Sequence, residues 1–379
     1  MVGRVRGRFL VGAVALVAST TVALLGVLPS AAVGMPETSQ PVLDGSAALL
    51  LRPLGLGVQS DLQPGSPLVV QHREIALMQD AGVEWVRIVL NWYVAEPQQG
   101  RYDEAYFRGM EDLLARLQAA GLRVMLLVLA TPPWANPAGW DAPPVRMADI
   151  GEFVAYAVRR LGARVQHWEI WNEPDWDLFW RPRPNVERFV EMLAETYTRG
   201  KAADPRAVFI SGGLAGNNVG YLRQMYALGA GRYFDALGVH PYVFRRAPDD
   251  VHPDTRHSFH GIVELRRVMV AHGDARKPVW ITEMSWPTHR RAPAASGDWA
   301  EGVSVETQAA YLTRAYEKIQ QEYPFVDVAM WYNLRDKGVD PTNVEHNFGL
   351  VRHDFQVKPA YRAFQLLARR FAAPRAAHP

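Results

Sequence analysis

Alternating strand-like and helix-like segments predict an α/β protein: a parallel (β/α)8 TIM barrel formed by a single domain. Eight short runs rich in Val, Ile, Leu and Trp are separated by amphipathic segments, and no long Pro/Gly/Ser linker divides them. A doubly wound open sheet is the competing architecture, and it usually has a Gly-rich phosphate loop after its first strand. The segment 54–58 lacks the third glycine of such a loop, and Pro64 and Pro67 follow before any helix. The barrel is therefore the expected fold.

The strands are identified as short apolar runs bounded by turn residues, and the helices by apolar residues at intervals of three and four. The expected strands are Leu54–Gln59, Trp85–Leu90, Val124–Leu129, Gln166–Trp171, Val208–Ser211, Ala236–His240, Val279–Thr282 and Val328–Tyr332. The expected helices include Gln71–Ala81, Ala105–Ala120, Ile150–Leu161, Val186–Ala203, His260–Ala271 and Glu306–Glu322.

The first 34 residues have the layout of a secretory signal peptide. Three arginines precede a nearly continuous apolar run from Phe9 to Leu28, and small residues at 30–34 offer a cleavage region. An uncleaved membrane anchor is the alternative, because an apolar run of about 20 residues can span a bilayer. We expect export to the cell envelope or medium, a flexible lead-in at 35–50, a catalytic domain at 51–371 and a tail at 372–379.

The composition excludes some partners. The chain has 379 residues, 49% of them hydrophobic, which is enough for a large core. It contains no Cys, so export would add no disulfide, and lipid attachment through an N-terminal Cys is excluded. Removal of residues 1–34 would remove three of the 41 Lys and Arg and none of the 39 Asp and Glu. The remaining chain would be almost neutral, which argues against a nucleic-acid partner.

Two glutamates stand at the ends of expected strands. Glu173 ends the fourth and is followed by Pro174, which cannot continue a strand ladder because it has no N–H. Glu283 ends the seventh. In a parallel barrel the active site is built at the carboxyl ends of the strands, so both carboxylates should face one site. A pair of carboxyl groups can cleave a glycosidic bond, since one donates a proton and the other acts as nucleophile or base.

Ordered motifs at other strand ends resemble those of a known clan. They are Asn91-Trp92, Glu96-Pro97, Gly100, Tyr102-Asp103, Asn172-Glu173-Pro174, His240-Pro241-Tyr242, Glu283, Trp331, Asn347-Phe348-Gly349-Leu350 and Lys358-Pro359-Ala360-Tyr361. The chain resembles the clan of (β/α)8 retaining glycoside hydrolases, and within it families 39 and 5, in particular secreted bacterial members of the cellulase-like kind. Family 39 xylosidases carry an additional β-domain, for which no sequence is left over here, so the resemblance favours the single-domain members.

The resemblance implies residue roles. Glu173 would be the acid/base and Glu283 the nucleophile, with Arg87 and Tyr242 as donors that keep Glu283 ionised. Arg87 has a second possible role as the partner of Glu169 inside the barrel, and the two roles can coexist.

Several other residues are expected to bind substrate. Asn172 would bind the 2-hydroxyl of the sugar, and His240 would either touch sugar or be a buried histidine bonded to a neighbour. Aromatic rings pack on the C–H faces of sugars. Six tryptophans stand at or just beyond strand ends: Trp92, Trp134, Trp176, Trp180, Trp286 and Trp331. Of these, Trp134, Trp286 and Trp331 are the candidates for this contact, whereas Trp85, Trp168 and Trp280 are expected in the core.

We expect no metal ion and no cofactor. His252, His257 and His260 lie in a loop with several aspartates but lack the ligand spacings of known zinc sites. That loop and residues 288–303 are more simply explained as loops that cover substrate.

The expected function is retaining hydrolysis of a β-linked poly- or oligosaccharide, with a carbohydrate as the only expected partner. Transglycosylation on the same scaffold and a non-catalytic glycan-binding barrel remain alternatives. The sugar, its linkage and endo or exo action are not encoded in any motif.

Overall fold

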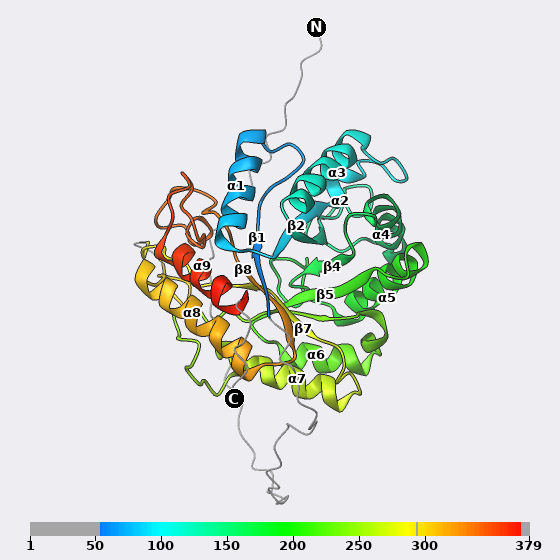
Figure 1. Cartoon of the computed structure of the whole chain (residues 1–379). Coiled ribbons are helices and arrows are strands. Elements are labelled where there is room, and N and C mark those ends of the chain that lie inside the picture. The colour runs from blue at the N-terminus through cyan, green and yellow to red at the C-terminus, as the bar shows by residue number, and fades with distance from the viewer. Residues whose placement is uncertain (1–53, 293–294, 373–379) are drawn as a thin grey trace, which may run out of the picture. The chain divides into compact units, whose positions relative to one another are not determined.

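The computed structural model of the protein describes residues 54–292 and 295–372. Its eight strands form a closed, all-parallel barrel in the order β1 to β8, and the helices surround it (Figure 1). The predicted (β/α)8 barrel is confirmed. The strands are β1 (Gly55–Gln59), β2 (Trp85–Asn91), β3 (Arg123–Leu129), β4 (His167–Asn172), β5 (Val208–Ala215), β6 (Leu237–His240), β7 (Val279–Met284) and β8 (Val326–Trp331).

All six expected helices are present, and further ones occur within the described residues. One of these is α9, which follows β8 in the chain and packs beside α8 and α1 (Figure 1). The α-helices are α1 (Leu68–Ala81), α2 (Trp92–Ala95), α3 (Glu104–Ala119), α4 (Met147–Leu161), α5 (Val186–Ala203), α6 (Val219–Ala227), α7 (Gly261–Ala271), α8 (Val305–Glu322) and α9 (Pro359–Ala372). Three short 3₁₀ helices are η1 (Ala230–Tyr233), η2 (Thr255–His257) and η3 (Val344–His346).

Side chains begin several of these helices. Asp103 accepts a hydrogen bond from the Tyr106 N–H at the start of α3, and Ser304 accepts one from Thr307 at the start of α8. Caps of this kind stabilise a helix by about 1 kcal/mol because they satisfy an otherwise unpaired N–H. At the other end of a helix, Gly82 adopts φ 75° and stops α1.

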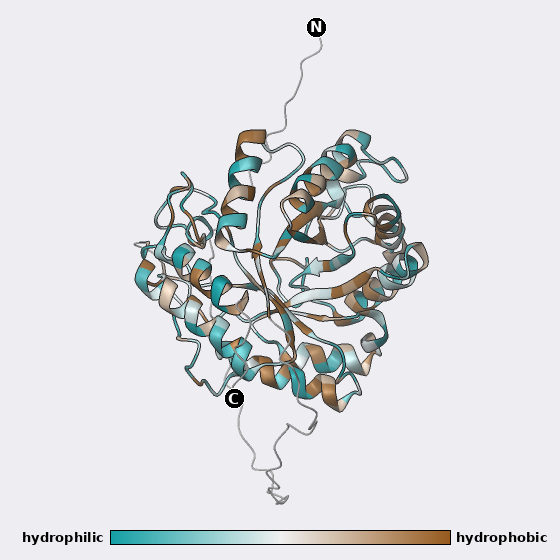
Figure 2. Ribbon diagram, in the orientation of Figure 1, coloured by the Kyte–Doolittle hydropathy of each residue, from teal (hydrophilic) through white to brown (hydrophobic). Residues whose placement is uncertain are grey.

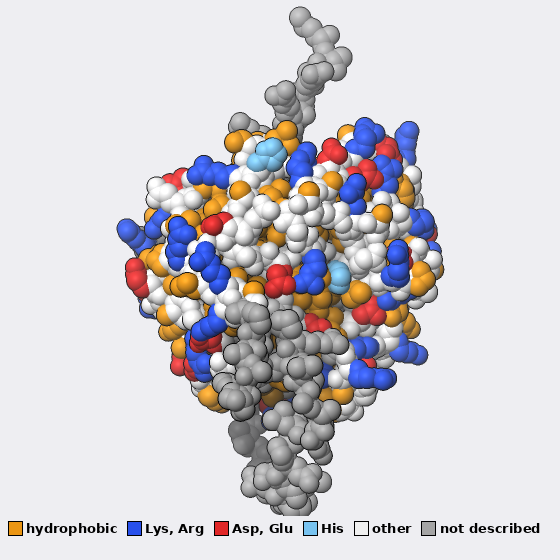
Figure 3. Space-filling view, in the orientation of Figure 1, with side chains coloured by type: hydrophobic (Ala, Val, Ile, Leu, Met, Phe, Trp, Pro, Cys, Tyr) orange, Lys and Arg blue, Asp and Glu red, His pale blue; other side chains and the backbone are white. Residues whose placement is uncertain are grey.

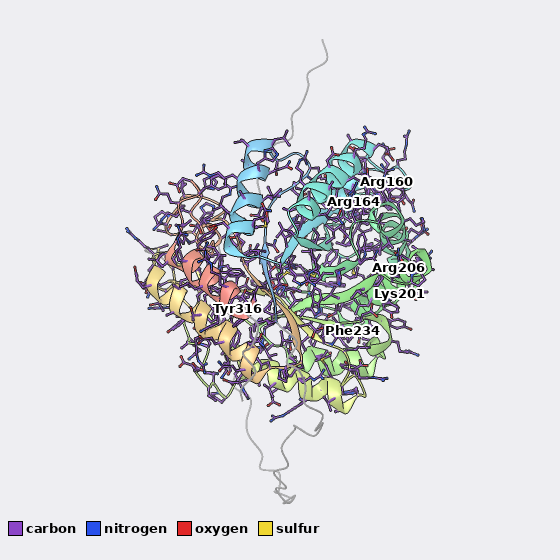
Figure 4. All side chains as sticks on the ribbon, in the orientation of Figure 1. Arg160, Arg164, Lys201, Arg206, Phe234 and Tyr316 are labelled. Atoms are coloured by element: carbon purple, nitrogen blue, oxygen red, sulfur yellow. The ribbon has the colours of Figure 1, made fainter. Side chains whose placement is uncertain are left out.

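The main core lies between the barrel and its helices, and apolar residues concentrate on the strands (Figure 2). Tyr316 of α8 is fully buried, whereas Arg160 of α4 reaches Glu111 of α3 at 2.6 Å on the outer ring (Figure 4). In the face shown in Figure 3, Lys and Arg side chains are interspersed with Asp and Glu. That face therefore carries no large field of one sign.

Inside the barrel, inward-facing residues form layers because strand side chains alternate with a period of two. The lower layer is an aromatic plug, in which the Trp85 and Trp280 rings lie 4.9 Å apart. On β2, β4 and β7 the inward residue two positions further along the strand is polar and lies closer to the carboxyl end, whereas on β8 it is Met330. The plug includes Trp85, His167 and Trp280, and the layer above it includes Arg87, Glu169 and Thr282.

The predicted signal peptide and lead-in, and residues 373–379 of the predicted tail, lie outside the described residues. Within the described part of the chain, no helix has both the length and the apolar character needed to cross a membrane.

Candidate active site

Glu173 and Glu283 face each other at the carboxyl end of the barrel. Glu173 follows β4 directly, and Glu283 is near the end of β7. Oxygens of the two carboxylates lie within 4.8 Å of each other, and both residues are buried, with exposed fractions of 4% and 7%. Glu173 has φ 42°, a left-handed conformation that non-glycine residues rarely adopt and that concentrates at functional sites.

Arg87 of β2 connects the polar layer of the barrel to Glu283. Its Nε donates to Glu169 at 2.6 Å, and its Nη1 donates to Glu283 Oε1 and, at 2.5 Å, to Gln59. Its Nη2 donates to Asn172 Oδ1 at 2.9 Å. Both roles considered for Arg87, contact with Glu169 and contact with Glu283, are therefore present in the geometry. A fully buried guanidinium held by four partners has a fixed position.

Glu283 is held in its charged form. Burial raises the pKa of the Glu283 carboxyl, but its neighbours His240, Arg87 and Tyr242 outweigh burial and leave the pKa below its ordinary value. Burial lowers the pKa of His240 to about 4, so this ring is neutral near pH 7. The charge that stabilises Glu283 at neutral pH therefore comes from Arg87, and the Tyr242 hydroxyl adds a hydrogen bond at 2.9 Å.

Glu173 has the opposite preference. Burial, and then the charge of Glu283, raise the pKa of the Glu173 carboxyl well above its ordinary value. Asp175, buried nearby and with its own pKa raised by burial to about 6, raises the pKa of Glu173 further. Two facing carboxyl groups with pKa values pushed in opposite directions can supply one proton donor and one anion near neutral pH.

His240 contacts Glu173 rather than open space. Its Nδ1 lies 2.9 Å from Glu173 Oε1, and its Nε2 lies 3.0 Å from the Thr282 hydroxyl. The strand β5 continues through Gly212 and Gly213 to Ala215, further than predicted. A Cβ at Gly213 would lie 2.1 Å from His240 Nε2, so glycine is required there for the ring to fit.

Asn172 presents its amide group to the site with a defined orientation. Its Oδ1 accepts from Arg87, which leaves the Nδ2 hydrogens as donors. The geometry is compatible with the expected contact to a sugar hydroxyl, which remains a prediction.

Two of the three tryptophans expected to stack on sugar lie in the core instead. Trp331 is 0% exposed and Trp286 is 1% exposed, their rings pack 6.1 Å apart, and their indole N–H groups donate to the carbonyls of Phe348 and Arg246. A ring without exposed surface cannot contact a sugar, so the prediction for Trp286 and Trp331 is wrong. Trp134 is half-buried and donates to the Glu96 carbonyl, and its contact with substrate stays a prediction.

Tyr332, the residue after Trp331, lies on the catalytic side. Its ring is 6.5 Å from that of Tyr242, and its hydroxyl donates to Glu345 at 2.8 Å and accepts from Lys337 at 2.5 Å. Lys337 also lies 3.8 Å from Asp61, in the loop after β1. We call Asp61, Tyr332, Lys337 and Glu345 the polar rim. Sequence patterns did not point to it, because Lys337 and Glu345 lie beyond β8 in a segment without a recognisable motif.

Glu173 and Glu283, the candidate pair, form a group with His240 whose spacing could suit a metal ion, and it is the one such group among the described residues. These atoms are already used, since Arg87 and Tyr242 bind Glu283, and both His240 nitrogens have partners. A cation would lie beside the Arg87 guanidinium, which opposes its binding. The histidines of the 252–260 loop do not form such a group among the described residues.

Comparison with known proteins gives relatives of the same architecture. A family model described as Glyco_hydro_42, beta-galactosidase, matches residues 67–203, which include Glu173 but not Glu283. A family 39 glycoside hydrolase from Bacteroides cellulosilyticus WH2 is 25% identical, with a TM-score of 0.69 over 84% of this chain and 64% of that protein. The chain thus spans less than two thirds of that relative's length.

Two other solved structures are similar in fold. The GH39 enzyme from Xanthomonas axonopodis pv. citri is 20% identical, with a TM-score of 0.66 over 84% of this chain and 66% of that one. A monomeric beta-xylosidase from Caulobacter crescentus CB15 is 19% identical, with a TM-score of 0.65 over 83% and 68%. No curated protein matches the chain. The resemblance to family 39 glycoside hydrolases noted from the sequence is therefore also found in the structure.

Proposed function

We propose that this protein is a retaining glycosidase that hydrolyses β-linked poly- or oligosaccharides. The observation that carries the proposal is the facing pair at the carboxyl ends of β4 and β7, with carboxylate oxygens within 4.8 Å. Retaining enzymes place their two carboxyl groups about 5–5.5 Å apart, whereas inverting enzymes leave about 6.5–9.5 Å for a water molecule. The similar family 39 glycoside hydrolase supports the same reaction class.

In the first step, Glu283 attacks the anomeric carbon while Glu173 protonates the leaving glycosidic oxygen. The bond from the anomeric carbon to that oxygen breaks, and a covalent ester to Glu283 forms. Arg87 and Tyr242 hold Glu283 ionised and aimed until it reacts. In the second step, Glu173 accepts a proton from water, which attacks the anomeric carbon and releases Glu283.

Substrate binding is assigned to groups around this pair. The Asn172 amide donates to the hydroxyl next to the anomeric carbon, and the polar rim contacts the remaining hydroxyls of the same sugar. Trp140 and Trp176 are 45% and 38% exposed, and both rings pack against Phe179. These exposed rings offer stacking surface for further sugar units of a polymer.

The chain would act outside the cytoplasm. The N-terminal basic residues followed by an apolar run support export, as a secreted protein or one anchored at the membrane.

A trapping experiment tests the chemistry. The intact protein is incubated with a panel of 2-deoxy-2-fluoro glycosides carrying good leaving groups, and its mass is measured. We expect a mass gain of one sugar on Glu283, absent in Glu283→Gln. Hydrolysis with inversion at the anomeric carbon, observed by NMR of the first product, would refute the proposal.

A further inference from the structure

A cavity of about 630 Å³ lies between the loops that follow β6, β7 and β8. Its size is within the range of small-ligand pockets, about 300–1,000 Å³. Three arginines from the three loops, Arg245, Arg290 and Arg352, lie in its wall, together with the first turn of α8. The cavity is on the same side of the barrel as the candidate pair, because all these loops leave the carboxyl ends of their strands.

The wall of this cavity carries excess positive charge. Glu301 is its one acidic residue and pairs with Arg245 at 3.1 Å. Arg290 and Arg352 are exposed, and neither side chain forms a hydrogen bond or ion pair with another described residue, although the charge of Arg352 lowers the pKa of Asp336. The first turn of α8, an 18-residue helix, also lies in the wall, where Glu306 offsets the partial positive charge of the helix end.

An adjoining cavity differs in this respect. It has a volume of about 430 Å³ and shares Arg245 and Glu301 with the first. Its other charged residues are balanced, since Asp250 and Asp298 offset Arg246 and Arg291. The excess positive charge is therefore found in the larger cavity and not in the adjoining one.

Trp299 joins the larger cavity to the catalytic pair. Its carbonyl accepts a hydrogen bond from His289 Nε2, a residue of the cavity wall, at 2.9 Å. Its ring lies 5.7 Å from that of Tyr242, whose hydroxyl binds Glu283. The wall of the larger cavity is thus connected to Glu283 through Trp299 and Tyr242.

We infer that this cavity is a subsite for an acidic sugar of the glycan, one that carries a carboxylate or a sulfate ester. A guanidinium offers two parallel N–H donors that match the oxygens of either anion, and an unpaired guanidinium is not fully neutralised within the protein. The inference rests on the proposed function, since it names the class of glycan that the glycosidase would take.

Binding is measured by calorimetry with the Glu283→Gln chain, so that no probe is cleaved. The probes are a β-linked oligosaccharide that contains a uronic acid, the same compound with its carboxyl group reduced to the alcohol, and a sulfated analogue. We expect the uronic acid or the sulfated probe to bind at least about tenfold more tightly than the reduced one. The double change R290Q/R352Q should abolish this difference, and R223Q, an exposed arginine of α6, should preserve it.

Equal affinity for the charged and reduced probes would overturn the inference, as would an equal loss for all probes in R290Q/R352Q. If inorganic sulfate binds as tightly as either charged oligosaccharide, the cavity is a site for free anions and the inference fails. Comparison of the uronic acid with the sulfated probe identifies the anion. Hydrolysis of aryl glycosides by the unchanged protein tests the proposed function separately, so either proposal can fail alone.

Discussion

His240 Nδ1 lies 2.9 Å from Glu173 Oε1, and this contact defines where the proton of the acid/base candidate resides. Both oxygens of Glu169 accept hydrogen bonds, one from Arg87 and one from the Thr282 hydroxyl at 2.7 Å. Thr282 has only one proton to donate, so its oxygen must accept from His240 Nε2, which lies 3.0 Å away.

A neutral His240 with its proton on Nε2 has an unprotonated Nδ1. Burial lowers the pKa of His240 to about 4, so the neutral form holds near pH 7. Nδ1 can then only accept, and Glu173 must donate to it. The chain from Glu169 through Thr282 to His240 thus favours the protonated form of Glu173, which is the form required of an acid.

Thr282→Val tests this chain of hydrogen bonds. It leaves His240 without an acceptor at Nε2, so the tautomer that accepts from Glu173 is no longer favoured. We expect the pKa of Glu173 to fall and the basic limb of the kcat/KM profile to move to lower pH, while Thr282→Ser keeps the original profile. An unchanged basic limb in Thr282→Val, with the fold intact by circular dichroism, would contradict this role.

The pH dependence of the proposed hydrolysis should be bell-shaped. Activity rises with pH as Glu283 ionises, at a pKa below its ordinary value, and falls as Glu173 loses its proton, at a pKa well above its ordinary value. Initial rates with an aryl glycoside across pH 3 to 10 measure both limbs. In Glu173→Gln the basic limb should disappear and kcat should fall by about 10²–10⁴-fold with poor leaving groups.

Arg87→Met should destabilise the barrel as well as the nucleophile. The change leaves Glu169 and Glu283 buried without their cation, and loss of one partner of a buried ion pair typically costs about 3–5 kcal/mol. Chemical denaturation measures this loss, and the acidic limb of the activity profile should move to higher pH because Glu283 ionises less readily. Arg267→Met, which removes a surface pair with Glu264 on α7, is the matched control and should cost less than about 1 kcal/mol.

The sequence predicted the barrel, and it predicted that Glu173 and Glu283 lie at the ends of strands, because both features depend on local patterns. Apolar runs that alternate with amphipathic segments mark the strands. The carboxyl ends of all strands meet at one end of a closed parallel barrel, so carboxylates at these ends lie on the same side. The orientation of Trp331 could not be obtained in this way, since both neighbours at the end of β8 are aromatic and the ring that faces outward depends on register. The end of β5 was also missed, because Gly212 and Gly213 indicate a turn unless the His240 ring beside them is known.

Paired substitutions at the end of β8 test which aromatic ring borders substrate. Tyr332→Ala should raise KM for an aryl glycoside, because Tyr332 positions Lys337 and Glu345 beside the catalytic pair. Trp331→Phe should leave KM unchanged and lower the free energy of unfolding by about 1–3 kcal/mol through lost packing against Trp286. A KM effect in Trp331→Phe alone would restore the original assignment of that ring to the substrate site.

Removal of metal ions should leave the proposed hydrolysis intact. The oxygen and nitrogen atoms of Glu173, His240 and Glu283 are close enough to hold a cation, yet the Arg87 guanidinium already neutralises Glu283 from the side of the barrel. A divalent ion would also need His240 Nδ1, which accepts the proton of Glu173. Rates with an aryl glycoside before and after dialysis against a chelator should therefore agree within error. If activity were lost on dialysis and recovered with one added divalent metal, these three residues would be metal ligands and the double-displacement assignment would have to be abandoned.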